Sequence, residues 1–188
     1  MIKYAQVGGH KTYLQSLDVR TLGVAGGSMI RVRDKKVVDV GPRSAHIAGK
    51  EYECFAPAGA IKAAKVQLVS PRSEDPCEYV TVLAQDGKEY SLTLAGAANL
   101  LGYVPEGDYA YGVSESNIPA WDALGAYLGI SGQEAARQVM NLAMQKLSVV
   151  VEELISEYEL DHNFITLVGG GGSGAVIVNA LAEKMNVR

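Results

Sequence analysis

The sequence predicts a mixed α/β fold in which one sheet is flanked by helices. Strand and hairpin signals fill the first half of the 188 residues, and helical signals fill the second half. Near the C-terminus a short apolar run enters a glycine-rich turn, from which a last helix leaves. A chain of this length can bury well over half of its unfolded surface. We therefore expect a single domain over residues 1–188 that needs no disulfide or metal to fold.

Alternation of apolar and polar residues predicts the strands. The runs 29–33 and 36–40 alternate on either side of Asp34 and Lys35, a pair that suits a tight hairpin turn. Further strands are expected at 65–70, 79–84 and 88–94. These later strands fall within residues 51–93, which we expect to form a small antiparallel β-rich insert.

Apolar residues at helical spacing predict two helices in the second half. The first is expected to begin at Ser116 or Asn117, with Pro119 in its first turn. Ser131 and the glutamate three residues later have the spacing of a capping box, in which each side chain satisfies a backbone donor. The long helix that follows, roughly 133–158, repeats apolar residues along one face, so that face should be buried.

Composition and charge exclude several classes of function. There are 17 Lys and Arg against 21 Asp and Glu and no basic stripe, which argues against a nucleic-acid partner. No apolar run reaches the roughly 18–20 residues of a membrane helix, and the N-terminus lacks a secretory signal. Cys54 and Cys77 form no metal-binding pattern, and His10, His46 and His162 are scattered, so we expect a reduced cytoplasmic protein without a metal site.

The sharpest chemical signal is the turn of Gly169, Gly170, Gly171, Gly172 and Ser173. The apolar run before it is typical of a buried parallel strand, and a helix follows. Glycines let the backbone approach a ligand, and a helix start offers unpaired N–H groups and a positive dipole end. The turn is no Walker loop, because no Gly-Lys-Ser/Thr follows. A flexible structural turn is the alternative, but four glycines in a row are entropically costly to order, which favours ligand contact.

Two other loops could contact a nucleotide or a substrate. Gly26, Gly27 and Ser28 could wrap a phosphate with their amides, and Asp18 ahead of them could hold Mg²⁺ or a water. Taken alone, Gly-Gly-Ser is also a common turn. Arg43 has a planar guanidinium that suits a carboxylate or a phosphate, although an arginine after Gly-Pro is more often a surface residue.

Four segments occur in a fixed order along the chain. They read SLDVRTLGVAGGSMIRV with VDVGPRSA, then TLAGAANLLGYV, then ISGQEAARQVMNLAMQKL, then FITLVGGGGSGAVIVNALAEKM. Together they resemble the hydantoinase A/5-oxoprolinase family. The resemblance covers most of the chain except roughly residues 51–89.

The resemblance implies the superfold of sugar kinases, actin and heat-shock ATPases, which holds ATP between two ribonuclease-H-like domains. The chain is then expected to be a fragment, cut at both ends, of one such half with a mixed sheet and flanking helices. In this superfold a Gly-Gly turn packs against adenosine, which assigns that role to Gly169–Ser173. The resemblance also places Asp18 and Gly26–Ser28 near the phosphates or the substrate, with ATP and Mg²⁺ as the cofactors of the full-length parent.

The chain departs from the family pattern in several places. Both phosphate loops of Asp-x-Gly-Gly-Thr type are absent, Ala97 or its neighbour stands where an aspartate is usual, and His46 stands where a glycine is usual. We therefore expect the isolated chain to be inactive.

The function implied by the resemblance is the adenosine-binding side of an ATP-dependent cyclic amidohydrolase of hydantoinase/5-oxoprolinase type. It would act on a small cyclic amide together with a second subunit or domain. Asp18 and Arg43 are the candidates for catalytic residues, and Asp18 is the candidate for a metal ligand. Two alternatives stay open: a subunit of an ATP-dependent carboxylase of the same family, and a non-catalytic regulatory or assembly domain.

Overall fold

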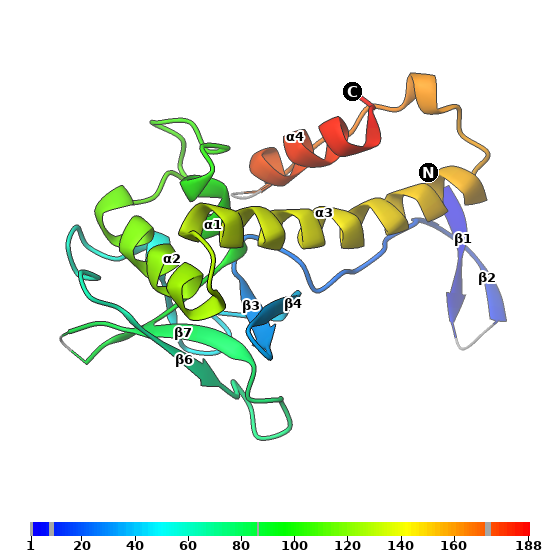
Figure 1. Ribbon diagram of the computed structural model, residues 1–188. Coiled ribbons are helices and arrows are strands. Elements are labelled where there is room, and N and C mark those ends of the chain that lie inside the picture. The colour runs from blue at the N-terminus through cyan, green and yellow to red at the C-terminus, as the bar shows by residue number, and fades with distance from the viewer. Residues whose placement is uncertain (1, 8–9, 86, 172–173) are drawn as a thin grey trace.

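The computed structural model describes residues 2–7, 10–85, 87–171 and 174–188. Its strands are β1 (Ile2–Val7), β2 (His10–Leu17), β3 (Ser28–Arg33), β4 (Lys36–Ser44), β5 (Glu51–Tyr52), β6 (Lys65–Val69), β7 (Tyr79–Leu83) and β8 (Glu89–Ser91). Its helices are α1 (Leu94–Leu100), α2 (Ser114–Leu128), α3 (Gly132–Glu157) and α4 (Gly174–Met185), with 3-10 turns at Glu53–Phe55 and His162–Phe164. The long helix α3 runs across the molecule, with the sheet on one side and α4 on the other (Figure 1). The prediction of a mixed α/β fold is confirmed.

The hairpin of β3 and β4 forms where the alternation predicts it. Asp34 and Lys35 both have positive φ, of 50° and 56°. Two central residues with positive φ define the turn whose twist matches that of the flanking strands. The short polar pair therefore sets the pairing next to the turn, Arg33 with Lys36, and the register then shifts twice on the way to Ser28.

The strands of residues 51–93 extend this same sheet. Strand β7 is its centre: Tyr79 pairs with both Val69 and Arg31, and Thr81 pairs with both Gln67 and Ser91. Strand β5 runs parallel to β8, whereas the other pairings are antiparallel, so the sheet is mixed. The segment expected as an insert thus completes the sheet that β3 and β4 begin.

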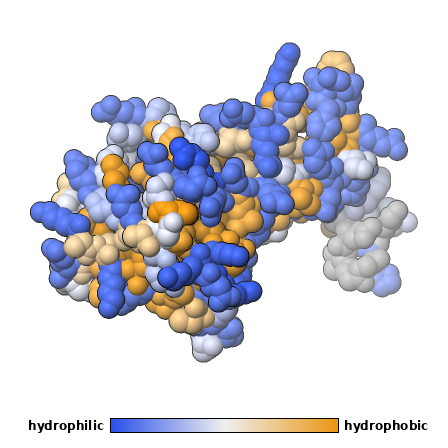
Figure 2. All heavy atoms as spheres, in the orientation of Figure 1, coloured by the Kyte–Doolittle hydropathy of each residue, from blue (hydrophilic) through white to orange (hydrophobic). Residues whose placement is uncertain are grey.

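Helix α3 carries the core. Its Ser131 cap accepts a hydrogen bond from the Glu134 amide, as the sequence predicts. The Lys146 ammonium donates to Asp39 Oδ1 at 2.6 Å and to the Val40 carbonyl at 3.0 Å, which fastens the helix to β4. Its buried face comprises Ala135, Ala136, Val139, Met140, Ala143 and Met144. In Figure 2, hydrophilic residues cover much of the viewed face, and apolar patches show between them over the lobe that holds the larger sheet and along the lower side of α3.

Helix α2 begins earlier than the sequence predicts. It starts at Ser114, so Pro119 lies in its second turn and the prediction of a cap at Ser116 or Asn117 is wrong. The reason is tertiary. The Ser116 hydroxyl donates to the Pro57 carbonyl, and the Asn117 amide donates to the Gly96 carbonyl, so neither side chain caps the helix.

In the apolar run 164–168, Phe164 ends a 3-10 turn and residues 165–168 belong to no assigned strand. The Leu167 amide donates to the Arg188 carbonyl at 2.6 Å, and the Arg188 amide donates to the Ile165 carbonyl at 3.3 Å. This is the hydrogen-bond pattern of parallel pairing, with α4 as the crossover between the two segments. Ile165 and Leu167 pack against the core, but Phe164 and Val168 are 86% and 89% exposed. The expectation of a fully buried strand is therefore wrong.

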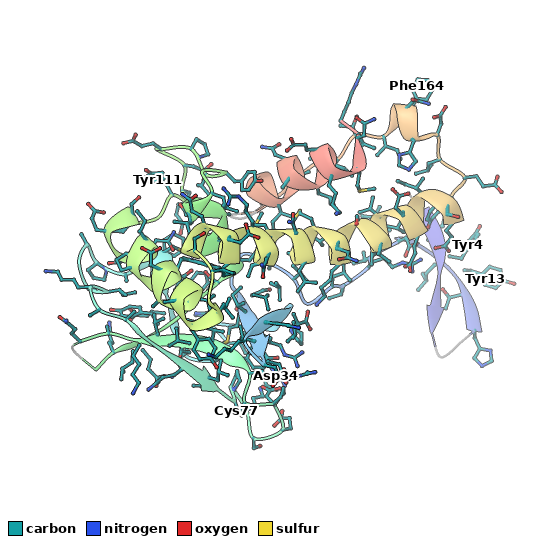
Figure 3. All side chains as sticks on the ribbon, in the orientation of Figure 1. Tyr4, Tyr13, Asp34, Cys77, Tyr111 and Phe164 are labelled. Carbon is teal, nitrogen blue, oxygen red and sulfur yellow. The ribbon has the colours of Figure 1, made fainter. Side chains whose placement is uncertain are left out.

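The chain begins with a hairpin that the sequence analysis did not foresee. Strands β1 and β2 form a two-stranded sheet separate from the larger one, beside the C-terminal end of α3 (Figure 1). Tyr4 and Tyr13, which Figure 3 labels on this hairpin, are both exposed. A lone two-stranded hairpin has little core of its own to bury.

Candidate functional site

A groove of 330 Å³ lies where the glycine-rich turn enters α4. The turn and residues of α4 line the groove together with Leu147 of α3 and with Val24 and Ala25, which precede β3. The groove is therefore bordered by two glycine-rich segments that lie about 145 residues apart in the sequence. The full lining is Val24, Ala25, Leu147, Leu167, Val168, Gly169, Gly170, Gly174, Ile177, Val178 and Leu181.

The three described glycines of the turn have different physical reasons to be glycine. A Cβ on Gly169 would lie 2.4 Å from the Gly174 carbonyl oxygen, so packing within the turn requires glycine there. Gly171 has a φ of +83°, which favours glycine on backbone grounds. A Cβ on Gly170 would meet no atom of the described residues within 4 Å, and its φ is not in the left-handed region. Gly172 and Ser173 lie outside the described residues.

Gly170 is the position of interest because the protein's own packing does not explain its lack of a side chain. It is exposed and lines the groove. A side chain there would point into open space that a ligand could otherwise fill. Glycine costs more conformational entropy to order than other residues, and no packing contact among the described residues requires it at this position.

In the second glycine-rich loop, residues 23–28, the first part borders the groove and the last part is buried in the fold. Ser28 Oγ accepts a hydrogen bond from the Ala25 amide at 2.8 Å, which closes the loop. A Cβ on Gly27 would lie 2.0 Å from the Tyr52 hydroxyl, so Gly27 is a packing glycine. Gly26 accepts from the Ala95 amide and lines a small apolar depression next to Ile177 of α4. The loop therefore reaches the groove through Val24 and Ala25, while Gly27 and Ser28 are buried.

The Gly41-Pro42 segment of β4 packs directly against this loop at Gly23. Gly41 has a φ of +75°, and its peptide bond to Pro42 is cis. A Cβ on Gly41 would lie 2.0 Å from the Gly23 carbonyl oxygen, and a Cβ on Gly23 would lie 2.6 Å from Pro42 Cβ. The close contact of these two backbones fixes the position of the loop that borders the groove.

Asp18 does not reach the groove. Its carboxylate accepts a hydrogen bond from the Tyr158 hydroxyl at 2.8 Å and pairs with Arg20. Tyr158 follows the C-terminal end of α3, whereas Leu147 borders the groove. Eleven residues of helix separate the two by roughly 16 Å along the axis. The structure thus brings Asp18 together with neither glycine-rich loop.

Arg43 is likewise occupied elsewhere. Its Nε and Nη2 donate to both Asp75 carboxylate oxygens over 2.8–3.0 Å, and Nη2 lies 3.4 Å from Glu74. The guanidinium beside Asp75 holds the pKa of that carboxyl below its usual range. The planar fork predicted to bind an anion therefore binds a carboxylate of the 70–78 loop.

The groove suits an uncharged ligand. Among the described lining residues none carries a charged or hydrogen-bonding side chain, and the walls are aliphatic or glycine. A nucleoside could pack there, because sites for small molecules are mostly apolar with few polar groups. The same walls offer no cation for a triphosphate and no carboxylate for Mg²⁺. Within the described parts of the chain, no cluster of three or more His, Cys, Asp or Glu could hold a metal ion.

Sequence reasoning missed Glu53, the one carboxylate that is buried among the described residues. It is fully buried and accepts hydrogen bonds from the Thr93 amide at 3.1 Å, the Thr93 hydroxyl at 3.0 Å and Trp121 Nε1 at 3.1 Å. Burial raises its pKa to about 7. A Cβ on Gly96 would lie 1.6 Å from Glu53 Oε1, so this glycine makes the room that the carboxyl needs. Nothing in the sequence around Glu53 marks it as buried.

The raised pKa of Glu53 predicts a stability that falls as pH rises. Below pH 4.5 the carboxyl is protonated in both states. Between 4.5 and about 7 the unfolded chain ionises while the folded one keeps the proton, so the free energy of unfolding falls, by up to about 3 kcal/mol. Above that range this group adds no further slope. Urea unfolding from pH 4.5 to 8 should show the decline in the native protein and a smaller one in Glu53→Gln, and equal slopes would contradict the assignment.

The segment 165–168, the glycine-rich turn and helix α4 together border one apolar groove. The chain matches the family described as hydantoinase/oxoprolinase over residues 1–188, so it belongs to that family. The resemblance read from the sequence is thereby confirmed.

One solved structure gives a likeness of fold. It is described as "Mechanism of ATP-Dependent Acetone Carboxylation, Acetone Carboxylase nucleotide-free structure" and matches with a TM-score of 0.62 and 19% identity. The match covers 100% of this chain and 23% of that one, so the chain spans about a quarter of the length of this structural relative. No curated protein matches the sequence. Of the helices in the described residues, none combines the length and apolar character needed to cross a membrane.

Proposed function

We propose that this chain forms the adenosine-binding side of the nucleotide site in an ATP-dependent enzyme of the hydantoinase/oxoprolinase family. The observation that carries the proposal is Gly170, which borders the groove and has no packing or backbone reason to lack a side chain. The aliphatic walls contributed by Val24, Leu147 and Ile177 fit the uncharged part of a nucleotide. In this account Gly169 and Gly171 shape the turn and Gly170 leaves room for the ligand.

The proposed architecture is one ribonuclease-H-like half of an actin-like ATPase. The parallel pairing of residues 165–167 with Arg188 across α4 supports it, because parallel neighbours joined by a helix are the repeating unit of such sheets. In open α/β sheets ligands bind beyond the carboxyl ends of the strands. In the proposed sheet, the turn that follows Val168 would lie at such an end.

The proposed reaction class is ATP-dependent activation of an amide or carbonyl oxygen. Phosphorylation of that oxygen makes a better leaving group, and it needs positioning and charge neutralisation more than covalent protein chemistry. The family favours a small cyclic amide as substrate, opened by hydrolysis. A carboxylase subunit is the second candidate, favoured by the likeness to the acetone carboxylase structure.

The phosphates and Mg²⁺ require groups that line the opposite side of the site. We propose that a second domain or subunit supplies them, since no described residue of the groove is charged. Most of the affinity for ATP would then come from charge-assisted contacts outside this chain. The isolated chain should hydrolyse no ATP and should bind it no more tightly than roughly millimolar.

An amide-resolved NMR titration with ATP and Mg²⁺ tests this proposal. Shift changes are expected at Val24, Ala25, Gly169, Gly170 and Ile177, because these residues border the groove. Changes confined to other parts of the chain, or none up to tens of millimolar ATP, would contradict it. Release of phosphate by the purified chain would show that it carries a complete catalytic site, contrary to the account.

A further inference from the structure

A buried polar cluster lies where the 3-10 turn that begins at Glu53 meets the starts of α1 and α2. Thr93 caps α1, and Asn117 and Trp121 belong to α2. All four side chains are buried, and every residue of the three elements that carry them is described. The cluster does not line the groove, so the proposed function does not use it.

The carboxamide of Asn117 has one end with a hydrogen-bond partner and one end without. Its Nδ2 donates to the Gly96 carbonyl at 3.0 Å, which sets the orientation of the amide, because a carbonyl oxygen can only accept. Its Oδ1 is buried and has no partner among the described residues. A buried acceptor without a donor is destabilising, so native folds rarely leave one.

The carboxyl of Glu53 lies beside this oxygen. Glu53 Oε1 is the atom closest to the position that a Cβ on Gly96 would take, and Asn117 Oδ1 lies 3.0 Å from the same position. Two oxygens that accept hydrogen bonds therefore lie close together in a buried site. An ionised Glu53 would repel the Asn117 oxygen, whereas a protonated Glu53 would offer it a donor.

The hydrogen bonds of the carboxyl leave room for one proton. A carboxylate offers about four lone-pair sites on its two oxygens. Three donors occupy such sites: the Thr93 amide and Trp121 Nε1 donate to Oε1, and the Thr93 hydroxyl donates to Oε2. A proton at the remaining site turns the carboxyl into the donor that Asn117 Oδ1 lacks.

We infer that folded Glu53 is a neutral carboxylic acid that donates a hydrogen bond to Asn117 Oδ1, and that this bond is a pH-sensitive contact between the 3-10 turn and α2. When the proton passes to water, the carboxylate repels Asn117 Oδ1. The amide must then turn, or the first turn of α2 must move. Either change weakens the bond from Asn117 to the Gly96 carbonyl of α1.

The described surroundings of the carboxyl are uncharged. On its own turn, the Cys54 thiol is neutral, because burial and then Glu53 raise its pKa. The Tyr52 hydroxyl, just before the turn, lies toward Gly27. Helix α1 carries no titratable side chain, and the two acidic residues in the first half of α2 are exposed. Burial raises the pKa of Glu53 to about 7, so the contact responds near neutral pH.

The test follows the Glu53 carboxyl carbon and the Asn117 side-chain amide of the 188-residue chain by NMR from pH 5 to 9. Both are expected to titrate together, with a midpoint near pH 7. Asn117→Leu removes the acceptor at similar volume. It should lower the Glu53 midpoint by about one pH unit, the tenfold loss of proton affinity expected when the acid loses one ordinary hydrogen bond. Thermal unfolding checks that this variant is folded.

Glu53→Gln is the second variant and does not depend on the folding of Asn117→Leu. Its amide keeps a donor for Asn117 Oδ1 at every pH, so the Asn117 side-chain resonances should stay constant from pH 5 to 9. Glu115→Gln is the matched control, because it removes an exposed carboxyl from the same helix. It should leave the titration of Glu53 and Asn117 unchanged.

Several results would overturn the inference. A Glu53 midpoint near 4.5 in the native chain would mean that the carboxyl is ionised. A midpoint that rises in folded Asn117→Leu would mean that the Asn117 amide donates to the carboxylate, and an unchanged midpoint would mean that the two groups do not interact. The inference also fails if the Asn117 amide still titrates in Glu53→Gln. None of these results bears on the proposed nucleotide groove, which the cluster does not line.

Discussion

Replacing Trp121 with alanine is expected to lower the free energy of unfolding by about 3–5 kcal/mol, the usual range for removing a buried aromatic side chain. Trp121 is fully buried in α2, and its indole N–H donates to Glu53 Oε1. The substitution leaves a cavity and also removes one of the three donors that hold a buried carboxyl. We expect the largest stability loss of any single substitution considered for this chain.

Trp121→Phe separates the two contributions. It keeps most of the apolar volume but loses the N–H, so Glu53 keeps only the Thr93 amide and hydroxyl as donors. An intermediate loss of about 1–3 kcal/mol is expected. Both losses are measured by urea unfolding at pH 6. A loss below 1 kcal/mol for Trp121→Ala would mean that α2 is not packed as described.

Gly41→Ala is the second large effect. The new Cβ would lie 2.0 Å from the Gly23 carbonyl oxygen, at a residue with a φ of +75°. Left-handed backbone costs about 1–2 kcal/mol for a residue with a side chain, and overpacking against fixed backbone adds about 1–3 kcal/mol. The expected loss of stability is therefore about 3 kcal/mol.

Gly49→Ala is the matched control for Gly41→Ala. Gly49 also has a positive φ, of 68°, but nothing lies within 4 Å of its Cβ position. It should lose only the backbone part, about 1 kcal/mol. Gly41→Ala should in addition shift the amide resonances of Val24 and Ala25, since it displaces the loop that borders the groove. Equal effects of the two variants would contradict the close contact of Gly41 with Gly23.

The sequence predicts regular elements well where side chains repeat with a clear period. Strand β3, the turn after it and the helix α3 appear within a residue or two of their expected bounds, because alternation and the Ser131 cap are local signals, whereas β4 continues to Ser44, four residues beyond its expected end. The start of α2 could not be read locally. Ser116 and Asn117 are good capping residues, but they bond to Pro57 and Gly96, which only the folded chain brings near.

The N-terminal hairpin has a local signal in the sequence. Two glycines separate two runs with tyrosine and threonine, and such a pair often marks a hairpin turn. The alternation is weak there, and the pairing shifts register between Tyr4 and Gln6. Strands β1 and β2 stand apart from the larger sheet, so they do not need a strongly apolar face to pack against its core. The clear alternation that would mark them as strands is therefore missing.

The candidate site was predictable only in part. The glycine-rich turn is visible in the sequence. The different reasons why its three described glycines lack a side chain become clear only from their neighbours in the folded chain. Asp18 and Arg43 have chemistry that suits ligands, yet Tyr158 and Asp75 engage them. Whether a charged side chain can bind a ligand therefore depends on its partners in the folded chain. Breaking an existing ion pair or hydrogen bond to free that side chain costs free energy.

The dissociation constant of ATP·Mg²⁺ for Gly170→Val, compared with that of the native chain by NMR titration, tests the central claim most directly. We expect the valine side chain to enter the groove with little effect on the fold, since no atom of the described residues lies within 4 Å of that Cβ position. Ala58→Val, at an exposed position outside the groove, is the control. The account predicts at least tenfold weaker binding for Gly170→Val, with unchanged thermal stability and a native constant for the control. Native-like binding by a folded Gly170→Val would show that nucleotide does not occupy this groove.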